Sequence, residues 1–294
     1  MGCPCRHVGF PHLATKISVY RFLLLCGVFG TPIFLLGLFV FGLGYPGYDH
    51  FNQAISELGA IDSPVKALVN IFVFNLFGVF IALFSLGIFQ SKEIGRIGKI
   101  GSLFFFAAGV VMFFVGIFYN DAIETPLTAR GDLHIKAAFY PFPIMTVGFL
   151  LFAFDIMAHK KLGWFVFPII VVGPIALILR YLSAQFPYPF FVGVLQRAAI
   201  VLPFLIMTAI AMALYRLETK KTLVLFSAAI AIAATGAVGM YLNGDGSSVK
   251  AGIPYLCSSE QSCRDYCATH RGRCQSTCAK YPASAVCQKL FSSL

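Results

Sequence analysis

The chain has 294 residues, of which 59% are hydrophobic and 12% are charged, against about 45–50% and about 25% in soluble domains. This composition leaves too little polar surface to coat a globule in water, so it excludes a soluble fold and indicates lipid as the solvent. The net charge of +10 is therefore interpreted first as a signal of membrane orientation.

Seven uncharged apolar stretches divide the chain, and each is apolar all round rather than alternating like a strand. Each is long enough for a helix that crosses about 30 Å of hydrocarbon at about 1.5 Å per residue. The approximate cores are 22–43, 67–89, 100–119, 137–154, 162–179, 198–215 and 222–242. The predicted fold class is therefore all-α: a polytopic membrane protein in which residues 20–242 form a seven-transmembrane-helix bundle.

The basic residues predict the orientation of this bundle. With the N-terminus inside, the inner segments hold eleven Lys and Arg against three acidic residues, a net +8, and the outer loops hold five against six, a net −1. The positive-inside rule then favours a cytoplasmic N-terminus and an extracytoplasmic C-terminus in the cell membrane. Residues 1–19 form a short cytoplasmic tail, in which Cys3 and Cys5 are expected to be reduced.

The first outer loop, residues 44–64, is rich in groups able to bind a ligand. Its apolar spacing predicts a short amphipathic helix that begins near Phe51 and ends at Gly59. The residues that share a face of this helix are Asn52 with Ser56 and Gln53 with Glu57. His50 precedes the helix and is expected to be solvated.

A few polar residues lie within or beside the spans. Asn70 and Asn75, in the second span, are expected to bond between helices. Asp155, at the cytoplasmic end of the fourth span, is expected to form an interfacial salt bridge with the basic run at 159–161.

Two arginines mark the outer ends of the fifth and sixth spans. A buried arginine in a membrane usually faces a partner or a water-filled cavity. The predicted ligand-binding residues of an outward-facing polar pocket are Arg180, Arg197, Gln196, Asp49, Ser56, Glu57 and His134. The alternative interpretation is that these groups form interfacial ion pairs that close the loops over the bundle, with the arginines reaching to the surface.

No catalytic residue is assigned from the sequence, and His134, Asp49 and Glu57 are weak candidates. A histidine beside a carboxylate would supply proton transfer. The chain lacks the H-E-x-x-H, G-x-S-x-G, Walker and G-x-G-x-x-G motifs. We therefore expect no cofactor and no metal.

The last residues have the composition of a disulfide-stapled module. After a linker at 243–256, six cysteines fall within residues 257–294. A helical hairpin that turns at Arg271-Gly272 predicts the pairs Cys257–Cys287, Cys263–Cys278 and Cys267–Cys274, one of fifteen possible pairings. The alternative is a zinc site formed by these cysteines and His270.

Three short motifs give the chain a resemblance to a known family. Tyr48-Asp49 is followed by Ile55-Ser56-Glu57-Leu58-Gly59, His134 opens the fourth span before Ala138-Phe139, and Gly193-Val-Leu-Gln196-Arg197 opens the sixth. Over about residues 18–240, the chain resembles archaeal and bacterial multi-span membrane proteins grouped as the domain of unknown function 998. The family's last motif usually reads Gly-x-x-Glu-Arg, so Gln196 stands where the resemblance implies an acid. The resemblance implies no particular activity.

The leading hypothesis is a non-enzymatic membrane protein that binds a lipid or other amphiphile in the outward-facing pocket. One alternative is an outward-facing hydrolase or transferase that uses His134 and an acid. Another is a structural or receptor-like envelope protein that contacts an extracytoplasmic protein partner through the Cys-rich tail. Because membrane insertion accounts for the basic charge, no nucleic-acid partner is expected.

Overall fold

The computed structural model describes residues 18–46, 48–122, 126–185, 191–219 and 223–243, and these residues contain helices and no strand. The α-helices are α1 (Val19–Leu43), α2 (Ile55–Leu58), α3 (Lys66–Leu68), α4 (Leu76–Gln90), α5 (Arg96–Ile117), α6 (Ala129–Phe139), α7 (Pro141–Ile156), α8 (Val166–Gln185), α9 (Val192–Thr219) and α10 (Leu223–Asn243). A π-helical segment, Val69–Asn75, joins α3 to α4, and a 3-10 turn, Gly163–Phe165, precedes α8.

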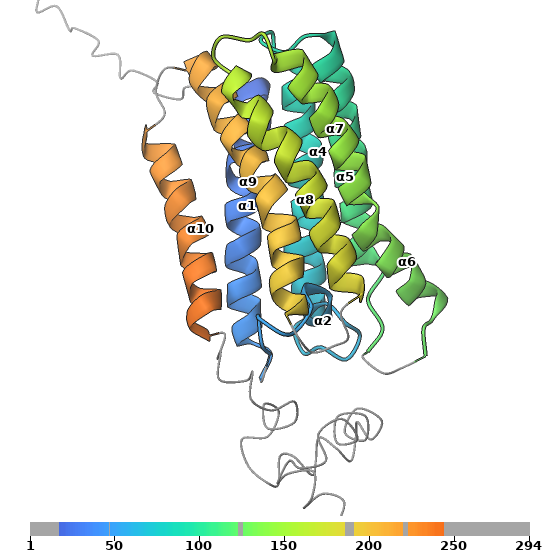
Figure 1. Ribbon diagram of the computed structural model, residues 1–294. Helices are drawn as coiled ribbons and strands as arrows, with labels where there is room; N and C mark the ends of the chain where they lie inside the picture. Colours follow the sequence, from blue (N-terminus) through green and yellow to red (C-terminus); the bar gives the residue numbers. More distant parts are fainter. Residues whose placement is uncertain (1–17, 47, 123–125, 186–190, 220–222, 244–294) are drawn as a thin grey trace, which may run out of the picture.

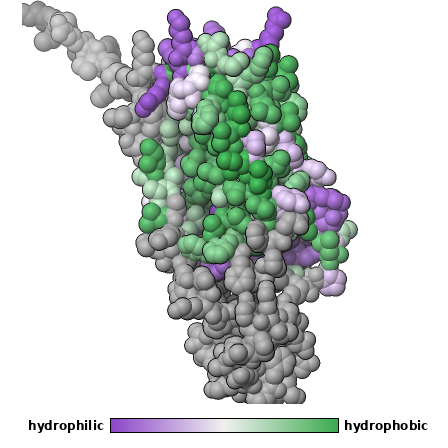
Figure 2. All heavy atoms as spheres, viewed as in Figure 1, coloured by the Kyte–Doolittle hydropathy of each residue, from purple (hydrophilic) through white to green (hydrophobic). Residues whose placement is uncertain are grey.

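Six helical stretches of the described chain are long and apolar enough to cross a membrane. They are Val19–Leu43, Lys66–Gln90, Arg96–Ile117, Ala129–Ile156, Gly163–Ala184 and Val192–Leu217. In Figure 2 their hydrophobic surface forms a continuous band, with hydrophilic residues gathered at the two ends of the bundle. The all-helical, multi-pass membrane architecture predicted from the sequence is confirmed.

Two of the predicted spans are not matched one for one. The seventh predicted span coincides with α10, which is not among the six stretches that qualify as spans in the described chain, so the count of seven stays a prediction. The fourth span begins earlier than predicted, because α6 adds Ala129–Phe139 before α7. The orientation also stays a prediction, and the Cys-rich tail with its predicted disulfides lies outside the described residues.

The spanning helices pack as a bundle (Figure 1). α5 lies against α4 and α7, α8 lies between α7 and α9, and α1 contacts α4, α9 and α10. α10 lies at one side of the bundle against α1 (Figure 1). The loop that carries α2 closes one end, which we call the α2 end. The α4–α5 and α7–α8 turns lie at the other end, which we call the Glu93 end (Figure 1).

Glycines permit the closest helix contacts of the bundle. A Cβ added to Gly78 of α4 would lie 2.5 Å from the backbone N of Phe113 and 2.7 Å from the carbonyl O of Gly109, both in α5. On the other side of α5, a Cβ added to Gly101 would lie 2.8 Å from the carbonyl O of Gly148 in α7. Without a hydrophobic driving force between helices in lipid, such close backbone packing is a main source of association.

The Gly78→Ala variant should lower the thermal midpoint of the full chain in detergent. The added methyl would meet backbone atoms, which cannot rotate away as a side chain does. We expect a loss of roughly 1–3 kcal/mol, the usual cost of overpacking. The matched control is Gly173→Ala in α8, where the added methyl would lie 3.5 Å from Thr146, an ordinary contact. Equal shifts in both variants would contradict this packing.

Candidate functional site

Arg197, in the second turn of α9, holds the loop between α1 and α4 against the bundle. Its Nη1 donates to the carbonyl O of Gln53 at 3.1 Å and to that of Gly193 at 2.9 Å. Its Nη2 donates to the hydroxyl of Tyr48 at 2.7 Å and to Nδ1 of His50 at 3.0 Å. All four Nη hydrogens therefore have acceptors within the chain.

The chain packs tightly around the guanidinium of Arg197. Tyr48 is 6% exposed and His50 is 4% exposed, and the Arg197 guanidinium carbon lies 5.8 Å from the centre of the Tyr48 ring. Glycine is needed on both sides: a Cβ at Gly42 would lie 2.5 Å from Nε2 of His50, and one at Gly193 would lie 2.5 Å from the carbonyl O of Gln53. The expectation that His50 is solvated is wrong, because tertiary packing buries it.

Burial changes the acid–base behaviour of both side chains. It raises the pKa of the Tyr48 phenol well above its ordinary value, although the charge of Arg197 acts in the opposite direction. Burial and, second, the charge of Arg197 lower the pKa of His50 from 6.5 to about 3. His50 is therefore neutral at physiological pH, and its proton is on Nε2 because Nδ1 accepts from Arg197.

The predicted carboxylates of this loop are buried and bonded. Asp49 accepts from the backbone N of Phe51 at 2.8 Å and from Nδ2 of Asn52 at 2.5 Å. Glu57 accepts from the backbone N of Ala54 at 2.9 Å and from Nε2 of Gln53 at 2.9 Å. The predicted contact of Gln53 with Glu57 therefore exists, but the predicted helix start near Phe51 is wrong, because α2 begins at Ile55 and Gln53 lies in the turn before it. These bonds fold the loop locally and shape the start of α2.

Gln196 and Ser56 complete this part of the predicted cluster. Oε1 of Gln196 accepts from the backbone N of Ile55 at 2.9 Å, so it caps the first turn of α2. A glutamate at this position would supply the same acceptor oxygen with a charge. Ser56 is half-buried, and its carbonyl accepts from the backbone N of Gly59, where α2 ends as predicted.

His134 lies on α6 in a second part of the α2 end. It is 1% exposed, and its Nδ1 lies 2.6 Å from the carbonyl O of Phe118 and 3.1 Å from that of Val115, both at the end of α5. Since a carbonyl only accepts, the Nδ1 atom carries the proton. Nε2 is buried and has no hydrogen-bond partner in the described part of the chain.

Arg180 lies near the end of α8 and is 9% exposed. Its Nη1 donates to the hydroxyl of Ser183 at 3.1 Å, and its guanidinium carbon lies 6.0 Å from the centre of the Phe139 ring on α6. Among the described residues, no carboxylate lies within ion-pair distance of Arg180. Its contact with Phe139 places it beside α6, the helix that also carries His134.

The predicted pocket residues thus fall into two groups with different contacts. The Arg197 group contains Arg197, Gln196, Asp49 and Glu57, with Tyr48 and His50 added. The Arg180 group contains Arg180, His134 and Phe139. The described residues contain no cluster of three or more His, Cys, Asp or Glu that could hold a metal ion.

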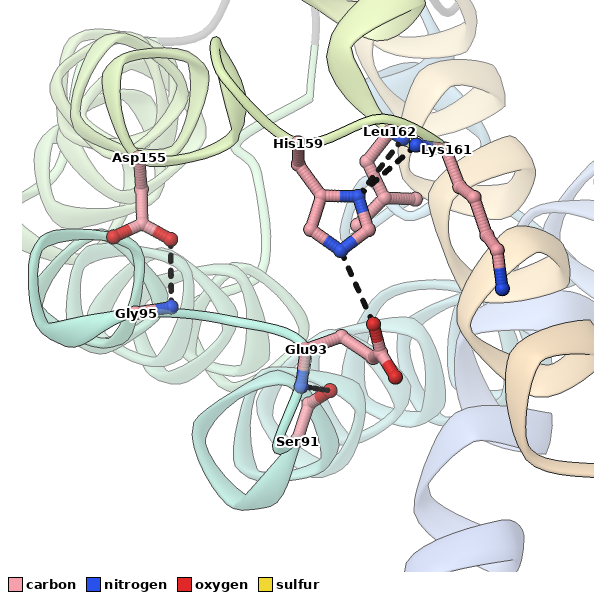
Figure 3. Close-up of polar contacts among 7 residues, drawn as sticks. All are labelled: Ser91, Glu93, Gly95, Asp155, His159, Lys161 and Leu162. Atoms are coloured by element: carbon pink, nitrogen blue, oxygen red, sulfur yellow. Dashed lines mark hydrogen bonds and ion pairs between the residues drawn. The ribbon is translucent and has the colours of Figure 1, made fainter.

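At the Glu93 end, two turns are tied together (Figure 3). Nε2 of His159 lies 3.1 Å from Oε2 of Glu93, and Nδ1 of His159 accepts from the backbone N of Leu162 at 3.1 Å. Asp155 accepts from the backbone N of Gly95 at 2.7 Å (Figure 3), so it caps α5 instead of forming the expected salt bridge. These contacts join the α4–α5 turn to the α7–α8 turn.

Several polar contacts inside the bundle join helices. Nδ2 of Asn75 donates to the carbonyl O of Phe113 in α5 at 2.6 Å, as expected, whereas Asn70 bonds to the carbonyls of Gly59 and Lys66. The Thr208 hydroxyl of α9 donates to that of Thr31 in α1 at 3.0 Å, a contact that sequence analysis missed. Two threonines at buried positions of apolar spans were the available signal.

These observations define the class of protein. The chain is a membrane-embedded, multi-pass helical protein with a loop-closed polar end. It belongs to the family of proteins of unknown function DUF998, whose model matches residues 28–213, and the resemblance found in the sequence is confirmed. No curated protein and no solved structure matches the chain. The family region includes both groups at the α2 end, and α10 and the Cys-rich tail lie beyond it.

The His50→Asn variant should remove an acid-induced loss of stability. A histidine whose pKa is 6.5 unfolded and about 3 folded stabilises the fold fully above pH 6.5, and this contribution is lost as the pH falls from 6.5 towards 3. The asparagine oxygen replaces Nδ1 as the acceptor for Arg197 but does not titrate. The thermal midpoint of the wild type should therefore fall more steeply with acid than that of the variant. Parallel curves would contradict the burial of a neutral His50.

Proposed function

We propose that the chain is a non-enzymatic membrane protein that binds a lipid or other anionic amphiphile at its α2 end, with Arg180 on the anionic headgroup. The observation that carries the proposal is a buried cation for which the described chain offers no carboxylate. A charged side chain in a membrane span is costly and usually marks a ligand or ion site.

The position of Arg180 suits a headgroup. It precedes the end of α8 at Gln185 by five residues, so it lies about 7.5 Å inside the helix end, at about 1.5 Å rise per residue. If α8 ends at the membrane surface, this depth places the guanidinium near the boundary between headgroups and acyl chains. The ring of Phe139 covers one face of the guanidinium and would restrict a headgroup to its edge, where the N–H donors point.

Arg197 has a different role in this proposal. Because its four Nη hydrogens are bonded to Tyr48, His50, Gln53 and Gly193, it positions the loop and does not clamp the headgroup. From the sequence, both arginines were expected to hold the ligand. The contacts favour a division in which Arg197 builds the wall of the site and Arg180 provides the charge.

We also propose that the α2 end faces the outside of the cell, as the positive-inside count favours. The exposed residues Lys92, Arg96, Lys160 and Lys161 lie in or directly after the α4–α5 and α7–α8 turns, which form the opposite, Glu93 end. The role of the Cys-rich tail towards an extracytoplasmic partner stays a proposal drawn from its composition, since residues 257–294 lie outside the described chain.

The Arg180→Gln variant should retain less anionic lipid than the wild type. We expect the purified full chain to retain phosphatidylglycerol over phosphatidylcholine in mixed nanodiscs, measured by mass spectrometry of bound lipid. One charge-assisted hydrogen bond is worth about 1.5–3 kcal/mol, so the variant should bind phosphatidylglycerol roughly ten- to a hundredfold more weakly. The matched control is Arg130→Gln, which removes an exposed arginine at the same end. Equal phosphatidylglycerol retention by Arg180→Gln and wild type would refute the proposal.

A membrane hydrolase or transferase that uses His134 is the second candidate. It is favoured by the geometry of His134, because Nδ1 is held by two carbonyls and Nε2 keeps a lone pair, as a general base requires. This candidate requires turnover of a lipid ester by the wild type and its loss in His134→Asn. The binding proposal expects no turnover in either protein, and lipid products released by the wild type alone would favour the enzyme.

A further inference from the structure

The negative charge of a lipid headgroup would provide a partner for Arg180, but it does not account for the buried Nε2 atom of His134. Its Nδ1 proton is shared between the carbonyls of Phe118 and Val115, so Nε2 of the neutral ring offers a lone pair. The atom is buried without a donor in the described chain. An unsatisfied buried acceptor costs free energy, and in a native protein it calls for an explanation such as a bound group.

Arg180 provides the complementary half of a site. Its guanidinium has donors only, whereas Nε2 of His134 needs a donor from its ligand. The two side chains come from different helices, α8 and α6, and the guanidinium carbon of Arg180 lies 6.0 Å from the ring centre of Phe139, which follows His134 by five residues on α6. A ligand that satisfies both must present an acidic oxygen and a hydroxyl on the same small group.

The geometry points to a phosphomonoester as this group, with an ionised oxygen accepting from Arg180 and the remaining P–OH donating to Nε2 of His134. This inference rests on the proposed function and names its ligand class. A phosphodiester headgroup without a hydroxyl would satisfy Arg180 alone. The same chemistry is offered by phosphatidate and by soluble phosphate, so the experiment distinguishes these sources.

The junction between α6 and α7 allows a movement of α6 that would admit such a ligand to His134. Nε2 of His134 is closed off by packing, so α6 must move outward to admit the group. Pro141 and Pro143 have no N–H, so the carbonyls of Ala137 and Phe139 lack their usual partners four residues on. Helices bend at such points, and α6 leans away from the bundle in Figure 1.

The test uses two lipids of equal charge. Full-length protein is placed in phosphatidylcholine nanodiscs that contain either phosphatidate or phosphatidylmethanol, at a pH below the second phosphate pKa of about 6. Both headgroups then carry one negative charge, but only phosphatidate keeps a P–OH. We expect the wild type to prefer phosphatidate by about tenfold, the ratio that corresponds to about 1.4 kcal/mol.

The variants separate the roles of the two side chains. In His134→Asn, the amide nitrogen replaces Nδ1 as the donor to Phe118, so this structural contact is kept while the Nε2 acceptor is lost. We expect this variant to bind the two lipids equally and to melt near the wild-type temperature. His134→Gln, which places an amide oxygen near the former Nε2, should restore part of the preference for phosphatidate. Arg180→Gln should weaken the binding of both lipids.

The outcomes are distinct. If the wild type binds both lipids equally and above phosphatidylcholine, the monoester inference is wrong and the proposed function stands. If it binds neither, both are wrong. Displacement of phosphatidate by inorganic phosphate but not by sulfate, which has no hydroxyl at this pH, would support the monoester and identify soluble phosphate as its source. A preference for phosphatidate that phosphate does not reverse would support the monoester and identify the lipid as its source.

Discussion

The guanidinium of Arg197 joins α9 to the loop after α1, and the order of the α2 end depends on this contact. Lipid offers no hydrogen bonds, so each polar group brought to the end of a span needs a partner from the chain. Arg197 meets this need for Gln53, Gly193, Tyr48 and His50 at once. Loss of one such donor leaves buried acceptors unpaired, at a cost of about 1–3 kcal/mol each.

Once the loop is fixed, the two arginines of the α2 end differ in the groups that they contact. Arg197 is bonded at every Nη hydrogen, and its buried Nε has no partner among the described residues. Burial and, second, the charge of Arg197 keep His50 neutral. Arg180 contacts a hydroxyl and an aromatic ring, and the neighbouring His134 keeps a free lone pair. A rigid wall built by one arginine, beside a second arginine for which the described residues offer no carboxylate, is the arrangement expected of a preorganised anion site.

The sequence predicts the apolar architecture well because span length is a local property. The start of α6 was missed because Arg130, Asp132 and Lys136 interrupt the apolar pattern, although Lys136 and Asp132 pair one turn apart on the exposed face, with Nζ and Oδ2 2.6 Å apart. The burial of His50 could not be predicted from its polar loop. It depends on Gly42 and on Arg197, which is 147 residues away along the chain. Candidate residues were thus identifiable by type, whereas their partners follow from tertiary contacts alone.

The central claim is that Arg180, and not Arg197, meets an anionic headgroup. Electron cryomicroscopy of the full chain in nanodiscs that contain phosphatidate tests it most directly. We expect phosphate density within hydrogen-bond distance of the Arg180 guanidinium, with Arg197 still bonded to Tyr48 and His50. A carboxylate of the chain on Arg180, or headgroup density on Arg197, would contradict it.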